Sequence, residues 1–163
     1  MNELIILVGP PAAGKSTWSK EKVQQNPNML IVGRDKLREL FYGYNEYTLQ
    51  DHFESLWLKE REATITILQN TLIERALVIG HTVIMDDTNC NLERLKATID
   101  RYKERHLVSV EMFYTPLDVC LTRNAERGRI VPIETIQRYH TNFQQIREYF
   151  NENPLRRNDN RST

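Results

Sequence analysis

The chain has 163 residues, and its 22 Lys and Arg side chains are balanced by 22 Asp and Glu, so its formal net charge is zero. This length fits one domain that buries a core without a disulfide or metal staple. With 40% hydrophobic and 27% charged residues, the composition excludes collagen-like, coiled-coil and wholly disordered chains. The zero net charge also excludes a uniformly basic coat for binding nucleic acid, although it is compatible with a local basic groove.

Two features bear on the compartment. Cys90 and Cys120 are too few for a secreted disulfide scaffold, so we expect free thiols in a reducing environment. The apolar run at residues 4–8 follows Glu3 rather than a basic segment, and it is far too short for a signal-peptide core or a membrane span. These features predict a cytoplasmic protein with no membrane partner.

Short apolar runs alternate with helical patterns along the chain. We predict strands and helices at the following residues: strands at 4–8, 29–32, 81–85 and 107–114, and helices at 15–25, 34–41, 51–79, 92–105, 116–124 and 134–151. This alternation predicts an α/β fold, with a parallel sheet of four or five strands flanked by helices. We assign one domain to residues 1–152 and a polar, flexible tail to 153–163.

The longest periodic segment, residues 51–79, predicts a helix with charged residues between apolar positions. The apolar side chains at helical spacing are Phe53, Leu56, Trp57, Ala63, Ile67 and Leu68.

Residues 9–16 match the phosphate-binding motif G-x-x-x-x-G-K-[ST] at every fixed position. Its two glycines allow conformations that turn successive N–H groups toward a phosphate, at the positive end of the helix that follows. Lys15 would reach the β- and γ-phosphates, and the Ser16 hydroxyl would bind Mg²⁺. Because a buried strand precedes the loop and a helix follows it, we predict a nucleoside triphosphate site. Its residues are Gly9, Pro10, Pro11, Ala12, Ala13, Gly14, Lys15, Ser16 and Thr17.

The reaction class depends on other residues. A GTPase-like switch is disfavoured because the sequence has no N-K-x-D, and a partner-driven ATPase usually has more domains than this length holds. A phosphotransferase needs a group that shields the transferring phosphoryl from water. Arg123, Arg127 and Arg129 flank a glycine-broken loop that suits such a lid, where an arginine would stabilise the transition state. The alternative is a solvated cluster of charges.

The second predicted strand leads into Asp35 and Arg38. Ligands bind at the carboxyl ends of the strands in open parallel sheets, so both residues would lie near the phosphate loop. Asp35 would accept the proton of an acceptor hydroxyl, and Arg38 would hold an acceptor phosphate from the same helix face. Alternatively, Asp35 only caps its helix.

The third predicted strand ends in Asp86 and Asp87, followed by Thr88 and Asn89. Acids at this position hold Mg²⁺ or its waters in phosphate-loop enzymes. The sequence does not say which of the two aspartates acts near the metal.

In their order and spacing these motifs resemble the kinase domain of bacteriophage-type 5′-polynucleotide kinases, over about residues 1–150. The resemblance is carried by residues 9–17 with Trp18, Arg34-Asp35-x-x-Arg38, Asp87-Thr88-Asn89 with Asn91 and Glu93-Arg94, Arg123-Asn124-x-x-Arg127-Gly128, and Val131-Pro132-Ile133. The family's 3′-phosphatase motif, Asp-x-Asp-x-Thr, does not occur here, so that activity is not predicted.

The resemblance implies Mg²⁺-dependent transfer of the ATP γ-phosphate to the 5′-hydroxyl of DNA or RNA, as in the repair of nucleic-acid ends. It implies catalytic roles for Lys15, Asp35 and Arg127, with Asp35 as general base, and nucleotide contacts from Arg123 and Arg127. Acceptor contacts would come from Asp35, Arg38, Asp87, Thr88 and Asn89, and metal contacts from Ser16 and Asp87. The alternative is a small-molecule or nucleoside kinase of the same fold.

The resemblance also changes the meaning of the charge balance. Fifteen of the 22 cations are arginines, which suit bidentate phosphate contacts. We therefore expect a strand end to be held through a few phosphates, with a shallow salt dependence.

Overall fold

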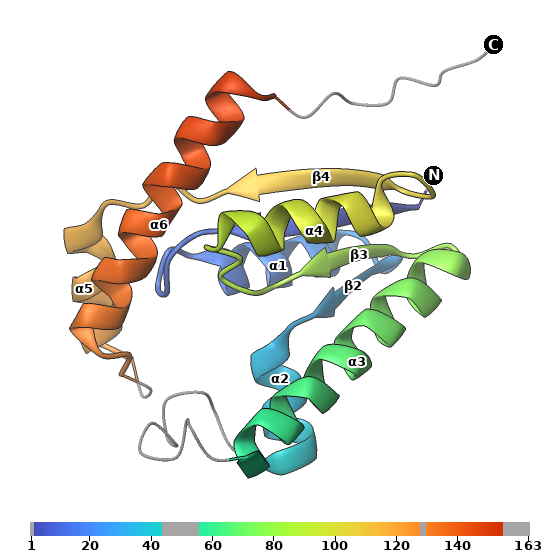
Figure 1. Cartoon of the computed structure of the whole chain (residues 1–163), viewed down its shortest axis with the longest axis horizontal. Coiled ribbons are helices and arrows are strands. Elements are labelled where there is room, and N and C mark those ends of the chain that lie inside the picture. The colour runs from blue at the N-terminus through green and yellow to red at the C-terminus, as the bar shows by residue number, and fades with distance from the viewer. Residues whose placement is uncertain (1, 44–55, 128–129, 155–163) are drawn as a thin grey trace.

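The computed structural model describes residues 2–43, 56–127 and 130–154. Within them, four strands form one parallel sheet in the order β2-β3-β1-β4, as Figure 1 shows. The strands are β1 (Glu3–Val8), β2 (Met29–Val32), β3 (Thr82–Met85) and β4 (Leu107–Met112). The predicted α/β class and all four predicted strands are confirmed, with boundaries that differ by at most two residues. Arg129 and most of the predicted tail lie outside the described residues.

The helices cover both faces of the sheet. They are α1 (Lys15–Gln25), α2 (Arg34–Tyr42), α3 (Leu56–Val78), α4 (Leu92–Tyr102), α5 (Leu117–Ala125) and α6 (Ile133–Glu152). Right-handed crossovers place α1 behind the sheet in Figure 1 and α3 and α4 in front of it. The main core lies on this front side, where apolar side chains of α3, α4 and α6 pack together against one face of β1.

Helix α3 is confirmed, but the apolar row expected from the sequence is not its buried face. Ile67 is 66% exposed, and Ala63 is also exposed. The side chains of residues 53, 56 and 57 lie outside the described set. The buried row is offset from the expected one and comprises Leu58, Ile65, Gln69, Ile73, Ala76 and Leu77. The helix carries two apolar rows. Packing against the sheet decides which row is buried, and sequence periodicity alone does not distinguish between them.

A second, smaller core fixes the loop between β1 and α1. Ala12 and Ala13 of this loop pack against Cys120 of α5, against Val131, which precedes α6, and against Ile136 within α6. The phosphate loop is therefore attached both to the sheet and to the C-terminal helices.

Two expectations about the environment of the chain can be compared with the structure. Cys90 and Cys120 are both free, as expected, and the structure shows that both are buried. None of the helices that the structure describes combines the length and the apolar character needed to span a bilayer.

Replacement of Leu77 tests the main core. Leu77 is fully buried among α3, α4 and β1, so Leu77→Ala should lower the free energy of unfolding by about 2–5 kcal/mol. Val78 is 66% exposed, and Val78→Ala should change the free energy of unfolding by less than about 0.5 kcal/mol. Urea denaturation of the two variants measures both values, and equal effects would contradict this packing.

Candidate active site

The phosphate loop has the backbone geometry that its glycines permit. Gly14 lies at φ 101°, a left-handed conformation that favours glycine, and Ala12 also has a positive φ of 66°. Gly9 is required for a different reason, since a Cβ there would lie 2.9 Å from the Cβ of Phe113 at the end of β4. Residues 11–16 line a cleft, and the exposed Thr17 lines a smaller pocket beside it.

Lys15 lies inside this loop with only 7% of its surface exposed. Its Nζ donates to the carbonyls of Gly9 and Pro10, both at 2.8 Å. Burial lowers the pKa of Lys15, the nearby charge of Arg127 lowers it further, and Asp86 and Asp87 oppose the shift. A bound polyphosphate would offset the desolvation of this ammonium, which suits the predicted role of Lys15 as a phosphate ligand.

Asp87, at the end of β3, connects the sheet to α2 and α3. Its Oδ1 accepts a hydrogen bond from the backbone N–H of Arg34 at 2.8 Å, and its Oδ2 accepts one from Gln69 Nε2 at 2.5 Å. Burial raises the pKa of Asp87, and these hydrogen bonds act in the opposite direction. Gly33 precedes α2 without a side-chain cap, so Asp87 supplies the capping carboxylate from a distant part of the chain.

Asp86 has different surroundings. Within the described ranges its carboxylate makes no hydrogen bond or ion pair, and it raises the pKa of Lys15 through its charge. The same ranges contain no cluster of three His, Cys, Asp or Glu side chains that could hold a metal on its own. The exposed Ser16 hydroxyl and the Asp86 carboxylate offer the oxygen ligands that Mg²⁺ uses beside nucleotide phosphates. Metal binding by Asp87 stays a prediction, and Asp86 is the second candidate.

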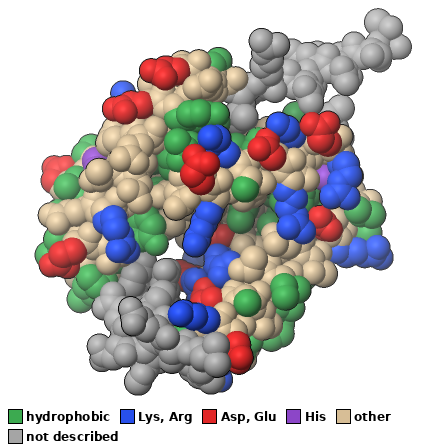
Figure 2. All heavy atoms as spheres, in the orientation of Figure 1, with side chains coloured by type: hydrophobic (Ala, Val, Ile, Leu, Met, Phe, Trp, Pro, Cys, Tyr) green, Lys and Arg blue, Asp and Glu red, His purple; other side chains and the backbone are tan. Residues whose placement is uncertain are grey.

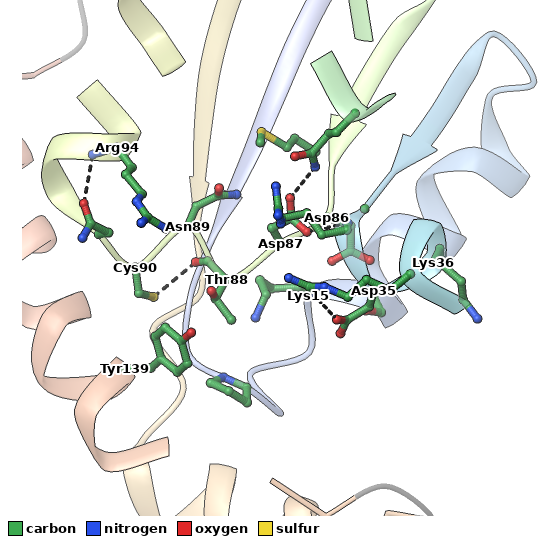
Figure 3. Close-up of a pocket in the computed structure, with 18 of the residues that line it drawn as sticks. Lys15, Asp35, Lys36, Asp86, Asp87, Thr88, Asn89, Cys90, Arg94 and Tyr139 are labelled. Carbon is green, nitrogen blue, oxygen red and sulfur yellow. Dashed lines mark hydrogen bonds and ion pairs between the residues drawn. The ribbon is translucent and has the colours of Figure 1, made fainter. Parts of the chain in front are cut away.

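Asp35 and Arg38 meet on α2, as their spacing predicts. Arg38 Nη1 donates to Asp35 Oδ1 at 2.8 Å. The Arg38 side chain is 7% exposed, whereas that of Asp35 is 47% exposed and lines the same cleft as Lys15 (Figure 3). Asp35 lies in the first turn of α2, and Gly33 is the N-cap, so Asp35 is not the N-cap.

Glu62 of α3 holds this arrangement in place. Its two carboxylate oxygens accept from Arg38 Nε and Nη2, both at 2.8 Å, and from Arg34 Nη2 at 2.7 Å. Burial alone would raise the pKa of Glu62, but the hydrogen bonds and charges of Arg38 and Arg34 lower it to about 2. The carboxylate is therefore ionised at neutral pH and fixes the guanidinium that contacts Asp35.

Sequence reasoning missed Glu62 and Gln69. Glu62 carries no distinguishing signal, because it lies in a charged stretch of a helix and its partners are 24 and 28 residues away. Gln69 does carry one, since it is the polar member of the row formed by Ile65 and Ile73 and is 3% exposed. A polar side chain in an apolar row needs a partner, and here that partner is Asp87.

Of the predicted lid arginines, Arg123 lies in the last turn of α5 and Arg127 lies two residues after the helix. Arg123 Nη1 lies 3.8 Å from the position of a Cβ on Gly14, and Arg127 lines both the cleft and the smaller pocket. The Asn124 side chain bonds the Val131 carbonyl at 2.8 Å and the Val131 N–H at 2.9 Å. This pair closes the loop that carries Arg127 and keeps its ends together. The smaller pocket also contains the edge-to-face pair Trp18 and Phe113.

The cleft has a volume of about 1780 Å³, above the roughly 300–1,000 Å³ of pockets that bury small ligands. Asp87, Thr88 and Asn89 line it together with Lys15, Asp35 and Arg38, so the structure brings these predicted groups together (Figure 3). Among its described lining residues, ten are Lys or Arg and five are Asp or Glu. Figure 2 shows blue side chains around the hollow in the middle of this face. A chain of zero net charge thus has a locally positive cleft.

The role of Glu62 has a signature in the pH dependence of stability. Glu62→Gln should lower the free energy of unfolding by about 2 kcal/mol at pH 7, since an amide cannot pair with two guanidinium groups. Because the folded-state pKa is lowered from 4.5 to about 2, this stabilisation is present above pH 4.5 and is lost as the pH falls toward 2.

Denaturation at pH 7 and at pH 3 measures this effect, and the difference between the variant and the original chain should narrow at the lower pH. Glu93→Gln is a matched control, because the Glu93 side chain is 80% exposed and, among the described residues, pairs with Lys96 alone, at 3.3 Å. If Glu62→Gln lowered the free energy of unfolding by the same amount at both pH values, the assigned ion pairs would be contradicted.

The chain has several known relatives. Residues 4–146 match a family model described as an AAA domain. The L-seryl-tRNA(Sec) kinase of Methanococcus maripaludis is 33% identical over 145 residues, which make up 86% of this chain and 52% of that protein.

Three solved structures have the same fold. A chain of the Pnkp1/Rnl/Hen1 RNA repair complex superposes with a TM-score of 0.76 at 28% identity, over 91% of this chain and 46% of that chain. A chain of a second Pnkp1/Rnl/Hen1 complex superposes with a TM-score of 0.63 at 27% identity, over 80% of this chain and 40% of that chain. The tunicamycin resistance protein of Deinococcus radiodurans has the same fold, with a TM-score of 0.53 at 15% identity over 96% of this chain and 98% of that protein.

This chain therefore spans about half the length of the curated relative and less than half of each Pnkp1/Rnl/Hen1 chain. The family match itself covers most of the sequence, and the phosphate loop, the parallel sheet and the lining of the cleft agree with it. The chain thus belongs to the AAA domain family (AAA_33), and its fold is that of a P-loop kinase.

Proposed function

We propose that the chain transfers the γ-phosphate of ATP to the 5′-hydroxyl at the end of a DNA or RNA strand. The observation that carries this proposal is the Asp35–Arg38 pair, which lines the same cleft as Lys15. Asp35 is half exposed to the cleft and can accept a hydroxyl proton. Arg38 lines the cleft and is rigidly held by Glu62, and its guanidinium is the proposed contact for an acceptor phosphate.

The residues support an in-line transfer. The acceptor hydroxyl gives its proton to Asp35, its oxygen bonds to the γ-phosphorus, and the bond from that phosphorus to the β–γ bridging oxygen breaks to release ADP. Lys15 and Arg127 stabilise the negative charge that spreads over the phosphoryl oxygens. Mg²⁺, when bound by Ser16 and an aspartate after β3, would neutralise charge on the β- and γ-phosphates.

The relatives support an acceptor attached to RNA. One similar chain belongs to a complex described as an RNA repair complex. The name L-seryl-tRNA(Sec) kinase also favours a second candidate, the hydroxyl of an amino acid carried by a tRNA. Both acceptors are hydroxyls attached to a polynucleotide. They differ in what lies next to the reacting hydroxyl: a strand end would offer Arg38 a neighbouring phosphate, and the hydroxyl of an amino acid would not.

A labelling assay separates these candidates. The chain is supplied with γ-labelled ATP, Mg²⁺ and one acceptor at a time: a 5′-hydroxyl oligonucleotide, a 5′-phosphorylated control of the same sequence, seryl-tRNA, or a panel of nucleosides and small alcohols. We expect label only in the 5′-hydroxyl oligonucleotide. Label confined to seryl-tRNA would establish the second candidate, and label confined to small molecules would refute both.

Asp35→Asn tests the proposed base. The amide cannot accept the hydroxyl proton, so we expect transfer to fall by about 10²–10⁴-fold while ATP affinity stays within about twofold. Isothermal titration with a non-hydrolysable ATP analogue measures the affinity. Asp100→Asn, at an exposed residue of α4 paired with Lys103, controls for the loss of one negative charge. Undiminished transfer by Asp35→Asn would show that Asp35 has only a structural role.

A further inference from the structure

The arginines that line the cleft differ in their partners. Arg34 and Arg38 are paired with Glu62. Arg94 of α4 and Arg138 of α6 have no hydrogen bond or ion pair from their guanidinium groups to any residue that the structure describes. Arg138 only lies over the ring of Tyr139, at 5.6 Å from its centroid. Arg94 and Arg138 therefore carry positive charge that none of the described residues neutralises through a hydrogen bond or ion pair.

The face of α4 that lines the cleft has a regular pattern. Arg94, Ala97, Thr98 and Arg101 recur at i, i+3, i+4 and i+7, so they share one side of the helix. The two small side chains leave room between the arginines. Arg101 is 3.6 Å from Glu74, but Glu74 is shared with Arg105 at 3.3 Å, so one carboxylate serves two guanidinium groups.

This row starts at the acceptor side of the site. Helix α4 begins at Leu92, three residues after Asn89, and Figure 3 shows the Arg94 side chain extending beside Asn89. From there the helix leads away from the phosphate loop. Arg94 and Arg101 are seven residues apart, which is about 10 Å along the helix axis. A stacked strand has one phosphate per roughly 3.4 Å, so the row spans about three nucleotide steps.

The opposite wall differs in charge. The charged α3 residues that line the cleft, Lys59 and Glu62, lie in the part of α3 whose Glu62 binds Arg38. Beyond them, up to Glu74, the lining residues are Ala63, Thr66, Gln69 and Asn70, which are uncharged. Phosphates would therefore lie on the α4 side, and sugars and bases would face hydrogen-bonding groups of α3. A small alcohol in contact with Asp35 would be too short to reach the far end of the arginine row on α4 or the uncharged lining of α3 opposite it.

We propose that Arg94 and Arg101, with Arg138, form a phosphate track that binds the backbone of a single-stranded polynucleotide for about three nucleotides beyond the end held at Asp35. This inference rests on the proposed kinase function and adds the class of acceptor, a single strand several nucleotides long. The track acts on binding, so its loss changes KM for long acceptors and leaves kcat and the shortest acceptors unaffected.

Steady-state kinetics with 5′-hydroxyl acceptors of two and of ten nucleotides test the track. For Arg94→Ala we expect KM for the decanucleotide to rise about fivefold, with unchanged kcat and an unchanged KM for the dinucleotide. Arg94→Lys keeps the charge and should recover most of the affinity. Arg75→Ala is the matched control, since Arg75 is an exposed helical arginine that does not line the cleft.

Binding of a fluorescent decanucleotide measures the same track without transfer. The slope of log K against log salt should become shallower by about 0.7 in Arg94→Ala, as expected for one lost phosphate contact, and should not change in Arg75→Ala. Transfer to oligonucleotides with equal KM and salt slope in both variants would overturn the track and leave the kinase proposal standing.

If no oligonucleotide is phosphorylated, the kinase proposal fails and this binding experiment alone decides the track. An acidic decapeptide that binds as tightly as the decanucleotide, with the same dependence on Arg94, would overturn the assignment to nucleic acid.

Discussion

The chemistry of the cleft depends on the alignment of the carboxyl ends of the parallel strands, because β1, β2 and β3 each supply one of its loops. Backbone hydrogen bonds extend this alignment beyond the strands: Gly9 N–H donates to the Thr88 carbonyl and Asp86 N–H to the Val32 carbonyl, both at 3.0 Å. Glycines make the close approach possible, and a Cβ on Gly33 would lie 2.8 Å from the Asp86 carbonyl oxygen. The loops are thus positioned by backbone contacts before any side chain acts.

Charge pairing then orients the side chains on this frame. Asp87 caps α2 and at the same time binds Gln69 of α3, so the helix carrying Asp35 is fixed at its first turn. Glu62 fixes the same helix one turn later through Arg38. These two carboxylates lie in the cleft wall, yet their contacts with the protein make them supports for Asp35. The proposed role of Asp35 as a base requires such rigid positioning, since the efficiency of a general acid–base step depends on geometry.

The parts of this site that can be predicted from the sequence are those marked by residues close to one another in the chain. The phosphate loop has fixed spacing, the strands are apolar runs, and the contact of Arg38 with Asp35 follows from a separation of three residues. The supports of the site have no such signal. Glu62 in a charged helical stretch looks the same whether it is solvated or paired, and an acid after a strand, such as Asp87, suits a metal ligand and a helix cap equally well. The buried row of α3 also depends on packing against the sheet, which periodicity does not contain.

The balanced charge of the chain and the basic cleft belong together. Attraction between exposed charges fades over a Debye length of about 8–10 Å at moderate salt, so a surface of mixed charge does not hold a polyanion at a distance. A strand that enters the cleft would meet arginines such as Arg94, which has no carboxylate partner among the described residues. The proposed transfer to a strand end has one productive binding position, and a uniformly basic surface would hold the polynucleotide at many unproductive ones. In the proposed reaction, excess charge concentrated beside Asp35 would direct binding to the strand end, and the small number of released counterions would let the product dissociate.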